Sequence, residues 1–556
     1  MATWPSTLPT PSFGGYALDP VDPVIRSDME SGSPRTRRRT RARNDKINVS
    51  WLLTDREMAA FRAWFDWSDG AAGGAAWFNI TLAYGDQGLR SREAKFASIF
   101  KANLAAGMLW SVSATLEIRG GDLTVDAILG AVLGLVSSSG VYPSLVLDFA
   151  GQQALDNRIT FTRASVGTYF DAEGVLRTAA DDVPRFDHDP LTGESLGLLV
   201  EQACTNSFPT SVYPAGISNG TWVDQAGVLA PDGATAKAFI PTVTNAMHTV
   251  PSSSVVDISA LAVGATTEIE LSAFTRDRDT YRPYFVLVAT DGIAPKYLLG
   301  QATGVNGALG SLSIGTGWSA TSSRVQLLKN GWRRVSMKGT YTKQTGDTQL
   351  FGSFQVWNGA GQQTYAGDGT SGIYLWGQQI GTPDQSYVPT NGSAVTRAAD
   401  SPTIAGAGFT SWYRQDEGTF LVSARRHGAN SVSAPLLFSV GGAYDDSMYM
   451  SKSVSGLTMV TSVRKGAATL SSSGLGSMVA DTLFKATTAY KLNDLASVLN
   501  AGAVTTDDTV EIPTVYVLAM GRSSWSVANH WNGHIARLAY YPQRLSNTEL
   551  QELTGA

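Results

Sequence analysis

The stretch Ile535-Ala-Arg-Leu-Ala-Tyr-Tyr541, close to the end of the chain, decides the fold class. It is a short run of apolar and aromatic residues that follows the turn signal Asn532-Gly533, a pattern typical of a β-strand. From Val141 onward the same pattern recurs, and Gly, Asp, Asn, Ser and Thr separate the runs. Further examples are residues 268–274, 332–337, 372–376 and 418–423. Many short strands with regular turn signals predict β-sandwiches or barrels.

The composition bounds the remaining possibilities. The chain has 556 residues, of which 43% are hydrophobic and 16% charged, with a net charge of −5. This apolar fraction argues against a disordered chain, and the small negative charge argues against a general nucleic-acid binder. Cys204 is the one cysteine, so an intrachain disulfide and a cysteine-based zinc site are excluded. The longest apolar run is too short to span a bilayer, which takes about 20 residues.

The first 121 residues predict a small α+β domain. Thr54-Asp-Arg-Glu57 is a capping box, and Met58, Phe61, Trp64 and Phe65 follow it at helical spacing. Strands are expected at 47–53, 77–82 and 109–118, where half-buried alternation is visible.

Residues 122–145 form an apolar linker, for which the sequence predicts a short helix. Its smooth apolar surface needs a second apolar surface to cover it. Ile128, Val132 and Leu135 are therefore predicted to form an oligomer contact, with a trimer favoured. The alternative is a helix that packs inside its own chain.

The fold class expected from these patterns is mainly β. A small N-terminal α+β domain (1–121) and the apolar helical linker (122–145) precede two β-sandwich, or jelly-roll, domains at 146–400 and 401–556.

Three stretches carry a resemblance to bacteriophage tail proteins. Trp4-Pro5, Gly14-Gly15-Tyr16 and the arginine run from Arg35 resemble a small structural protein of long-tailed phages. A second set is similar to a segment common in phage tail fibres. It comprises residues 159–165, 169–178, 184–190, 192–201 and 205–206, with 375–380, 387–390 and 396–400 as its closing partner. The third, Trp531 to Pro542 with Leu545-Ser546 and Glu549-Leu550, resembles the last strand of concanavalin-like (laminin-G-like) jelly rolls.

The resemblance implies a tail fibre or receptor-binding protein. Residues 1–121 would attach to the virion, 146–400 would be a carbohydrate-binding-module-like sandwich, and 401–556 a concanavalin A-like sandwich. It implies no catalytic residues. In concanavalin-like folds the first and last strands meet in one sheet, so 418–423 is expected to pair with 535–541. A closing helical turn with a capping box, Ser546 with Glu549, would cover one end of this sandwich with Leu550 and Leu553.

Two groups of arginines are candidate contact residues. The first is predicted to pair with acidic groups of a neighbouring tail subunit, because guanidinium groups bind carboxylates bidentately; nucleic-acid binding is the alternative that we disfavour. This group comprises Arg35, Arg37, Arg38, Arg39, Arg41 and Arg43. Arg425 and Arg426 open a polar loop over 425–433 that suits an acidic host glycan.

The remaining candidate sites are acidic, histidine and tryptophan residues. No cofactor is expected, although Ca²⁺ could bind at the acidic pairs Asp181-Asp182, Asp445-Asp446 or Asp507-Asp508, or at Asp187-His188-Asp189. The pair His530 and His534 has zinc-like spacing, but a turn interrupts it. Four tryptophans near turns are possible sugar platforms, although each is more typical of a core or edge position: Trp222, Trp412, Trp525 and Trp531.

The function predicted from the sequence is a structural component of a phage tail, located in the virion, that binds a host glycan or a pilus. Its partners would be other tail proteins and the receptor, with no nucleic acid and no membrane span. One alternative is a polysaccharide depolymerase, and another is a purely structural baseplate protein.

Overall fold

The computed structural model forms two compact units, Met1–Pro143 and Ser144–Ala556. The structure describes residues 2–19, 24–27, 35–38, 44–83, 89–105, 107–119, 125–250, 255–290, 295–301, 309–310, 313–428, 434–454, 456–466 and 468–555. In these ranges no helix is long and apolar enough to cross a membrane.

The first unit is built on one sheet with the strand order β1-β6-β7-β9-β5-β2, and β8 pairs with β9. The strands are β1 (Ala2–Thr3), β2 (Ser12–Asp19), β5 (Asp45–Leu53), β6 (Phe78–Ala83), β7 (Leu89–Phe96), β8 (Lys101–Ala105) and β9 (Leu109–Ile118). The 3₁₀ turn η1 (Ala72–Gly74) precedes β6.

Helix α1 (Asp55–Asp66) begins at the predicted capping box, in which Thr54 accepts from the Glu57 amide. Its buried residues are the four predicted ones, Met58, Phe61, Trp64 and Phe65.

Two further elements of this unit carry predicted contact residues. The hairpin of β3 (Val24–Ser27) and β4 (Arg35–Arg38) holds the start of the arginine run, and Ile25 pairs with Arg37. Arg39, Arg41 and Arg43 lie outside the described residues. Helix α2 (Val125–Val132) occupies the predicted apolar linker.

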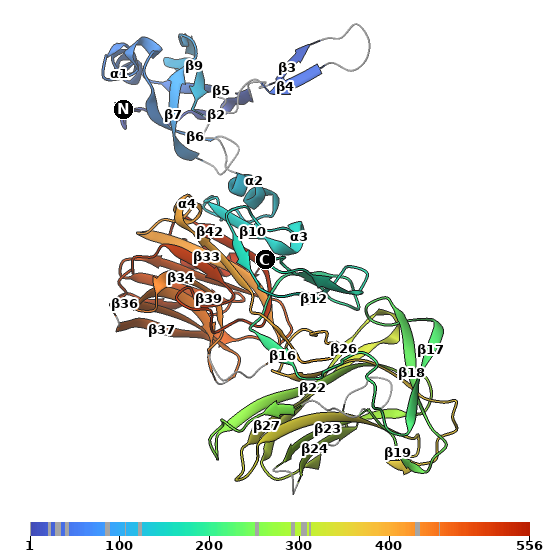
Figure 1. The fold of residues 1–556 in the computed structure, drawn as a ribbon. Coiled ribbons are helices and arrows are strands. Elements are labelled where there is room, and N and C mark those ends of the chain that lie inside the picture. The colour runs from blue at the N-terminus through green and yellow to red at the C-terminus, as the bar shows by residue number, and fades with distance from the viewer. Residues whose placement is uncertain are drawn as a thin grey trace. The chain divides into compact units, whose positions relative to one another are not determined.

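The second unit contains two β-sandwiches (Figure 1). We call the first the C-terminal sandwich. One of its sheets has the order β14-β15-β42-β33-β38-β39-β40, with β10 also paired to β42, and the other has the order β11-β32-β41-β34-β35-β36-β37. The first sheet comprises β10 (Leu145–Asp148), β14 (Phe186–His188), β15 (Ser195–Val200), β33 (Glu417–Arg426), β38 (Phe484–Lys491), β39 (Asp494–Leu499), β40 (Thr505–Asp507) and β42 (Gly533–Tyr541). The second comprises β11 (Thr160–Thr162), β32 (Ser401–Ala405), β34 (Leu436–Ala443), β35 (Asp446–Lys452), β36 (Thr458–Lys465), β37 (Ala468–Ser477) and β41 (Val517–Met520). Short helices accompany the sheets: α3 (Phe149–Gln152), α4 (Gly406–Thr410) and α5 (Asn547–Gly555).

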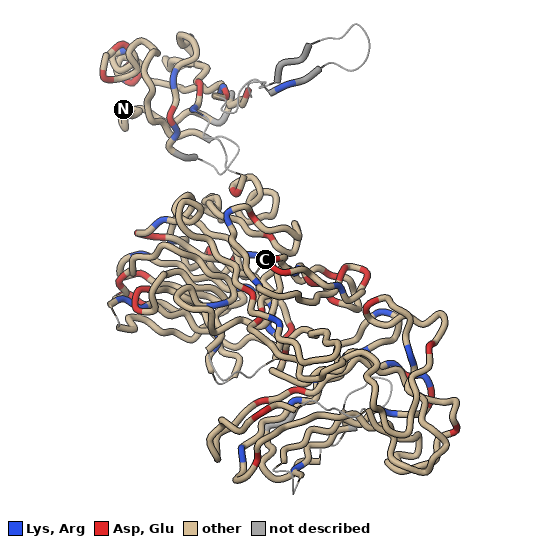
Figure 2. Tube along the Cα trace, in the orientation of Figure 1, with Lys and Arg blue, Asp and Glu red and all other residues tan. Residues whose placement is uncertain are grey.

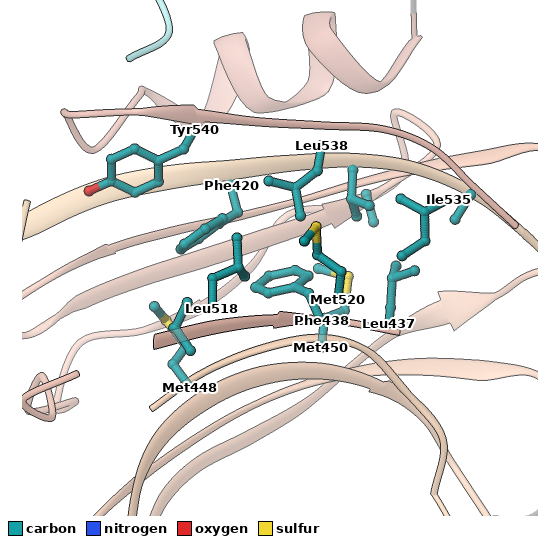
Figure 3. Packing of buried hydrophobic residues seen from close by; sticks show 14 of the residues in the cluster. Phe420, Leu437, Phe438, Met448, Met450, Leu518, Met520, Ile535, Leu538 and Tyr540 are labelled. Carbon is teal, nitrogen blue, oxygen red and sulfur yellow. The ribbon is translucent and has the colours of Figure 1, made fainter. Parts of the chain in front are cut away.

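The predicted closure of this sandwich is confirmed. Strand β33 pairs antiparallel with β42, and Phe420 lies opposite Tyr540. Leu538 and Tyr540 share the face that enters the core, where they meet residues such as Phe438 and Met520 of the opposite sheet (Figure 3). Because side chains alternate along a strand, Phe420 and Val422 enter the same core. The capping box at Ser546 is also present, and Leu550 and Leu553 of α5 are buried.

The predicted division at residue 400 needs a correction. Strands β10 and β15 pair with β42, and β11 pairs with β32, so much of 145–200 belongs to the C-terminal sandwich. The other sandwich is an insertion, which leaves through β16 (Cys204–Asn206) and returns through β31 (Val395–Arg397), and these two strands pair with each other. The sequence patterns could not reveal this division, because period-two alternation does not identify which strands pair.

The inserted sandwich also has two sheets. One has the order β17-β18-β30-β22-β27-β26, and the other the order β20-β28-β23-β24-β25 with β21 paired to β28. The first comprises β17 (Gly220–Leu229), β18 (Thr235–Pro241), β22 (Thr266–Arg276), β26 (Trp318–Leu327), β27 (Arg333–Thr342) and β30 (Ile373–Gly381). The second comprises β20 (Thr249–Val250), β21 (Val255–Asp257), β23 (Arg282–Thr290), β24 (Lys296–Gln301), β25 (Ser313–Ile314) and β28 (Gln349–Trp357). Smaller elements are β19 (Ala246–Met247), which pairs with β29 (Thr364–Tyr365), and the 3₁₀ turn η2 (Lys329–Gly331).

A hairpin and a shared apolar cluster join the two sandwiches. The hairpin of β12 (Gly167–Phe170) and β13 (Leu176–Ala179) comes from the segment before the insertion. Its Phe170 and Leu176 are buried in one cluster with Phe274, Trp332 and Trp376 of the inserted sandwich. The expected fold class, a mainly β chain with a small α+β part and two sandwiches, is therefore confirmed.

Candidate functional site

A groove of about 540 Å³ lies on the outer face of the second sheet of the inserted sandwich. Strand β28 explains its origin, because its residues alternate strictly between the core and this face. Leu350, Phe354 and Val356 enter the core, whereas Ser353 and Gln355 line the groove. We call this groove the aromatic groove. Its lining comprises Met247, Thr249, Tyr284, Val286, Val288, Tyr297, Leu299, Phe351, Ser353, Gln355, Trp357 and Gln363.

The strand register arranges the lining in rows across the sheet. Gln355 lies opposite both Thr249 and Tyr284. Ser353 lies opposite Val286, which in turn lies opposite Leu299. One row further along, Val288 has Phe351 on one side and Tyr297 on the other. The groove therefore changes from polar to apolar along the strands.

Two aromatic rings stack at the polar end. The rings of Tyr284 and Trp357 have centroids 4.0 Å apart and are nearly parallel, with 2° between their planes. Both side chains are half-buried and both line the groove. Burial raises the pKa of Tyr284, which keeps its hydroxyl protonated and able to donate. Tyr297 adds a third ring that is 44% exposed.

An amide network supports the stacked pair. The Trp357 indole Nε1 donates to Gln355 Oε1 over 3.1 Å, and Gln363 Nε2 donates to the same oxygen over 3.0 Å. Gln363 Nε2 also lies 3.5 Å from the Met247 sulfur. These contacts hold Gln355 and Trp357 in place in the absence of a ligand.

The described lining of the aromatic groove carries no charged side chain. Lys, Arg, Asp and Glu are sparse along the strands of this sheet (Figure 2). Lys296 of β24 donates instead to Asp347 over 2.7 Å. The groove thus offers ring faces, hydroxyls and amides. Ring faces stack on the apolar faces of sugar rings, and amides and hydroxyls bond to sugar hydroxyls, so this combination can hold a carbohydrate.

Arg425 lies at the edge of a different cleft, of about 320 Å³, between the two sandwiches. Its Nη2 pairs with Glu194 Oε1 at 2.6 Å. Arg324 also lines this cleft and pairs with Asp481 at 3.0 Å. Burial alone would raise the pKa of Asp481, but the hydrogen bond from His427 and the charges of His427 and Arg324 lower it to about 2. The cleft is therefore charged but internally compensated.

Arg426 does not share this position, and the prediction that it contacts a glycan is corrected. Its side chain is 1% exposed, and its Nη1 donates to the carbonyl oxygens of His427 and Gly428. Alternation along β33 explains the difference, because neighbouring strand residues point to opposite faces. Both arginines end a strand instead of opening a loop, and residues 429–433 lie outside the described residues.

The predicted oligomer residues are split by their exposure. Ile128 and Val132 are 50% and 77% exposed, whereas Leu135 is 7% exposed. Because Leu135 is already covered by its own chain, the prediction that it contacts a second copy is wrong. It lies beyond the end of α2, where the Leu135 amide donates to the Gly130 carbonyl.

The residues that carry the tail-fibre resemblance form a buried ion network. Arg163 and Arg185 each contact Asp400, the former at 3.2 Å. Arg185 and Arg397 both contact Glu201, at 2.8 and 3.4 Å. Burial alone would raise the pKa of Glu201, but the charges of Arg397 and Arg185 outweigh it and hold this pKa well below its usual value. These motif residues tie together segments on both sides of the insertion, which is a structural role.

The acidic and histidine residues considered as metal ligands make hydrogen bonds within the protein instead. Asp182 accepts from the Arg163 amide, Asp507 from the Thr509 amide, and Asp187 from the Phe170 amide. His534 contacts Asp187 at 2.8 Å, whereas His530 faces the Asp400 carbonyl. Within the part of the chain that the structure describes, no group of three or more His, Cys, Asp or Glu side chains is placed to hold a metal.

None of the residues predicted from the sequence to bind a ligand lines the aromatic groove. Of the four tryptophans considered as sugar platforms, Trp412 and Trp531 are buried in the core of the C-terminal sandwich. The available signal was the alternation Phe351-x-Ser353-x-Gln355-x-Trp357, which places mixed aromatic and polar groups on one face. That signal does not say which face is outside, because both faces of β28 carry aromatic residues.

Comparisons with known proteins do not settle the function. No family model matches the chain, and no curated protein matches it. Similar solved structures include the CBM40 of a Ruminococcus gnavus IT-sialidase bound to α2,3-sialyllactose (18% identity, 26% of this chain, 84% of that chain, TM-score 0.23). A second is the pair of domains LG4-5 of the mouse laminin α1 chain, with 10% identity over 59% of this chain and 92% of that chain and a TM-score of 0.17. A third is Trypanosoma rangeli sialidase, with 9% identity over 97% of this chain and 98% of that chain and a TM-score of 0.22. TM-scores this low do not establish a shared fold or a shared function.

The fold and the site together define a class. The chain is a two-sandwich β protein with a small N-terminal α+β unit and an uncharged aromatic groove on the inserted sandwich.

Proposed function

We propose that the protein is a tail fibre or tail-tip component of a bacteriophage virion that binds a glycan of the host surface in the aromatic groove. The stacked pair of Tyr284 and Trp357 in an uncharged groove is the observation that carries the glycan-binding part. The sequence resemblance to phage tail proteins supports the virion part. A pilus is the alternative receptor.

Binding fits the groove better than hydrolysis does. Glycoside hydrolysis commonly uses two carboxyl groups placed across the scissile bond. The described lining supplies ring faces, hydroxyls and amides, which position a sugar without attacking it. A depolymerase, the alternative function, would need carboxyl groups outside this lining, and a reducing-sugar assay on host polysaccharide tests for it directly.

The N-terminal unit is proposed as the virion attachment. Arg35, Arg37 and Arg38 lie on β4 of a two-stranded hairpin, and Arg37 is exposed. An arginine-rich hairpin can pair with carboxylates of a neighbouring tail subunit. In a purely structural baseplate protein, the other alternative, this unit would have the same role and the groove would remain without a ligand.

Several copies acting together would strengthen weak binding at each groove. We propose that the exposed Ile128 and Val132 of α2 contribute to an oligomer, with a trimer favoured. Arg425 is kept as a proposed second contact for an acidic group of the receptor, because it lines the charged cleft.

The experiment that tests the glycan-binding proposal is a glycan array probed with the full chain, with Trp357→Ala and with Tyr516→Ala. Tyr516 is an exposed tyrosine outside the groove, which makes its variant a matched control. We expect wild type and Tyr516→Ala to bind the same glycans, and Trp357→Ala to lose roughly tenfold or more in affinity, as the loss of a stacking ring implies. Equal binding by all three proteins would overturn the proposal.

A further inference from the structure

We infer that the aromatic groove selects neutral glycans that carry an N-acetyl group, whose carbonyl oxygen accepts a hydrogen bond from Gln355 Nε2. This inference deepens the glycan-binding function proposed above and rests on it. It follows from the orientation of one amide, from the apolar side chains of Val286 and Leu299 in the next row, and from the lack of charge in the described lining.

The orientation of the Gln355 amide is fixed by its partners. An indole N–H can only donate, so the atom 3.1 Å from Trp357 Nε1 must be the Gln355 oxygen. Gln363 Nε2 donates to the same oxygen, so both of its lone pairs are used. Gln355 Nε2 makes no hydrogen bond to the residues that the structure describes, although Gln355 lines the groove. Gln355 therefore presents donors only, and its ligand partner must be an acceptor.

The next rows along the strands carry an apolar surface. Val286 and Leu299 lie one row beyond Gln355, beside Ser353, and Val288 lies two rows beyond, beside Phe351. Successive residues on one face of a strand are about 7 Å apart, so a substituent on a sugar bound over Gln355 can reach this surface. A methyl group gains from burial against Val286 and Leu299, whereas a bare hydroxyl gains no such burial.

An acetamido group matches both features. Its carbonyl oxygen is an acceptor for Gln355 Nε2, and its methyl group can pack against Val286 and Leu299. A charged substituent does not match, because the described lining supplies no counter-charge to replace its hydration. The favoured ligands are therefore neutral N-acetylated glycans, because uronic acids and amino sugars carry a charge and plain hexoses lack the methyl group that the groove can bury.

The test compares paired probes that differ only in the acetamido group. The full chain is titrated with chitotriose and cellotriose, and separately with N-acetylgalactosamine and galactose. We expect at least one N-acetylated probe to bind about tenfold tighter than its hydroxyl partner, since the acetamido group adds one hydrogen bond and one buried methyl group. Gln355→Glu keeps an acceptor for Trp357 and Gln363 but removes the donor, so it should abolish the preference.

The matched control is Gln362→Glu, which adds the same charge at an exposed neighbour whose own amide oxygen accepts from Asn358 Nδ2. Melting temperatures show that each variant is folded. If none of the four probes binds to wild type, the proposed glycan function of the groove itself fails. If wild type binds both members of each pair equally, or if Gln355→Glu keeps the preference, the groove binds glycans but this inference is overturned.

Discussion

Asp400 accepts from guanidinium groups on both of its carboxylate oxygens, with Arg163 on one and Arg185 on the other, and it also accepts from the Glu201 amide over 2.9 Å. All three ionic side chains are fully buried. Buried charges of this kind are stable only when every partner is present, because removing one leaves an opposite charge without compensation in a medium that hydrates it poorly.

Asp400→Asn should therefore destabilise the second unit strongly. The amide keeps the size of the side chain but removes its charge, and the expected loss in the free energy of unfolding is about 3–5 kcal/mol. Chemical denaturation monitored by fluorescence measures it. Asp445→Asn, at a carboxylate that is 53% exposed, is the control and should change stability by less than about 0.5 kcal/mol. Similar values for the two variants would contradict the role given to the network.

A second residue-scale prediction concerns pH. Burial lowers the pKa of His530 from 6.5 to about 4, and burial also lowers that of His534. The unfolded chain therefore binds more protons than the folded chain between pH 6.5 and 4, so stability falls as the pH falls through this window. The His530 contribution amounts to roughly 3 kcal/mol over the window.

His530→Asn should flatten this pH dependence. Urea unfolding at several values between pH 7 and pH 4 measures the slope for the variant and for wild type. Asn cannot titrate, so the variant keeps only the part of the slope that comes from His534 and other groups. An unchanged slope would show that His530 is protonated as easily in the folded chain as in the unfolded one.

These residues mark what the sequence could and could not reveal. The motif residues Arg163, Arg185 and Asp400 were identified from the sequence, but their role depends on contacts between segments more than 200 positions apart, which a linear pattern does not contain. Arg425 and Arg426 were treated alike, although the strand alternation leaves Arg425 half-buried in the cleft and buries Arg426 completely.

At the scale of elements, the sequence predicted correctly those features that depend on contacts between residues close together in the chain. Both capping boxes were predicted, and both are present at the starts of α1 and α5. The pairing of β33 with β42 was also predicted, on the resemblance to concanavalin-like folds. The insertion was missed because β10, β11 and β15 read as strands of either sandwich until their partners are known.

The cap of α5 yields an element-scale prediction. The Ser546 amide donates to Glu549 Oε2 over 2.8 Å, and the Glu549 amide donates back to Ser546 Oγ over 3.4 Å. Ser546→Ala removes the second bond and should cost about 1 kcal/mol in the free energy of unfolding. Thr548→Ala, at an exposed position in the first turn, is the control and should cost much less. Equal losses would mean that the cap contributes little.

Helix α2 provides the second element-scale prediction. Val132→Asp places a charge on an exposed position, so the melting temperature should stay within a degree or two while an oligomer dissociates. Leu135→Asp places a charge at a buried position and should lower the melting temperature. Sedimentation measures the assembly state of both variants. An oligomer of Val132→Asp as large as that of wild type would exclude this face as the contact.

At the scale of the whole molecule, the two sandwiches of the second unit are expected to unfold together. They share the cluster of Phe170 and Leu176 with Trp332 and Trp376, and the ion network lies at the base of the insertion. Linked domains melt separately when few contacts join them, whereas a buried apolar cluster and a buried ion network join these two. Scanning calorimetry of the full chain should show one transition for Ser144–Ala556, which Asp400→Asn moves as a whole. A separate transition for the inserted sandwich would contradict this coupling.

The central claim, that the aromatic groove is the glycan site, is tested most directly by a crystal structure of the full chain soaked with an oligosaccharide that binds it. We expect sugar density over the rings of Tyr284 and Trp357, within hydrogen-bond distance of Gln355 Nε2. Sugar density at another place, such as the charged cleft beside Arg425, with the aromatic groove empty, would contradict it.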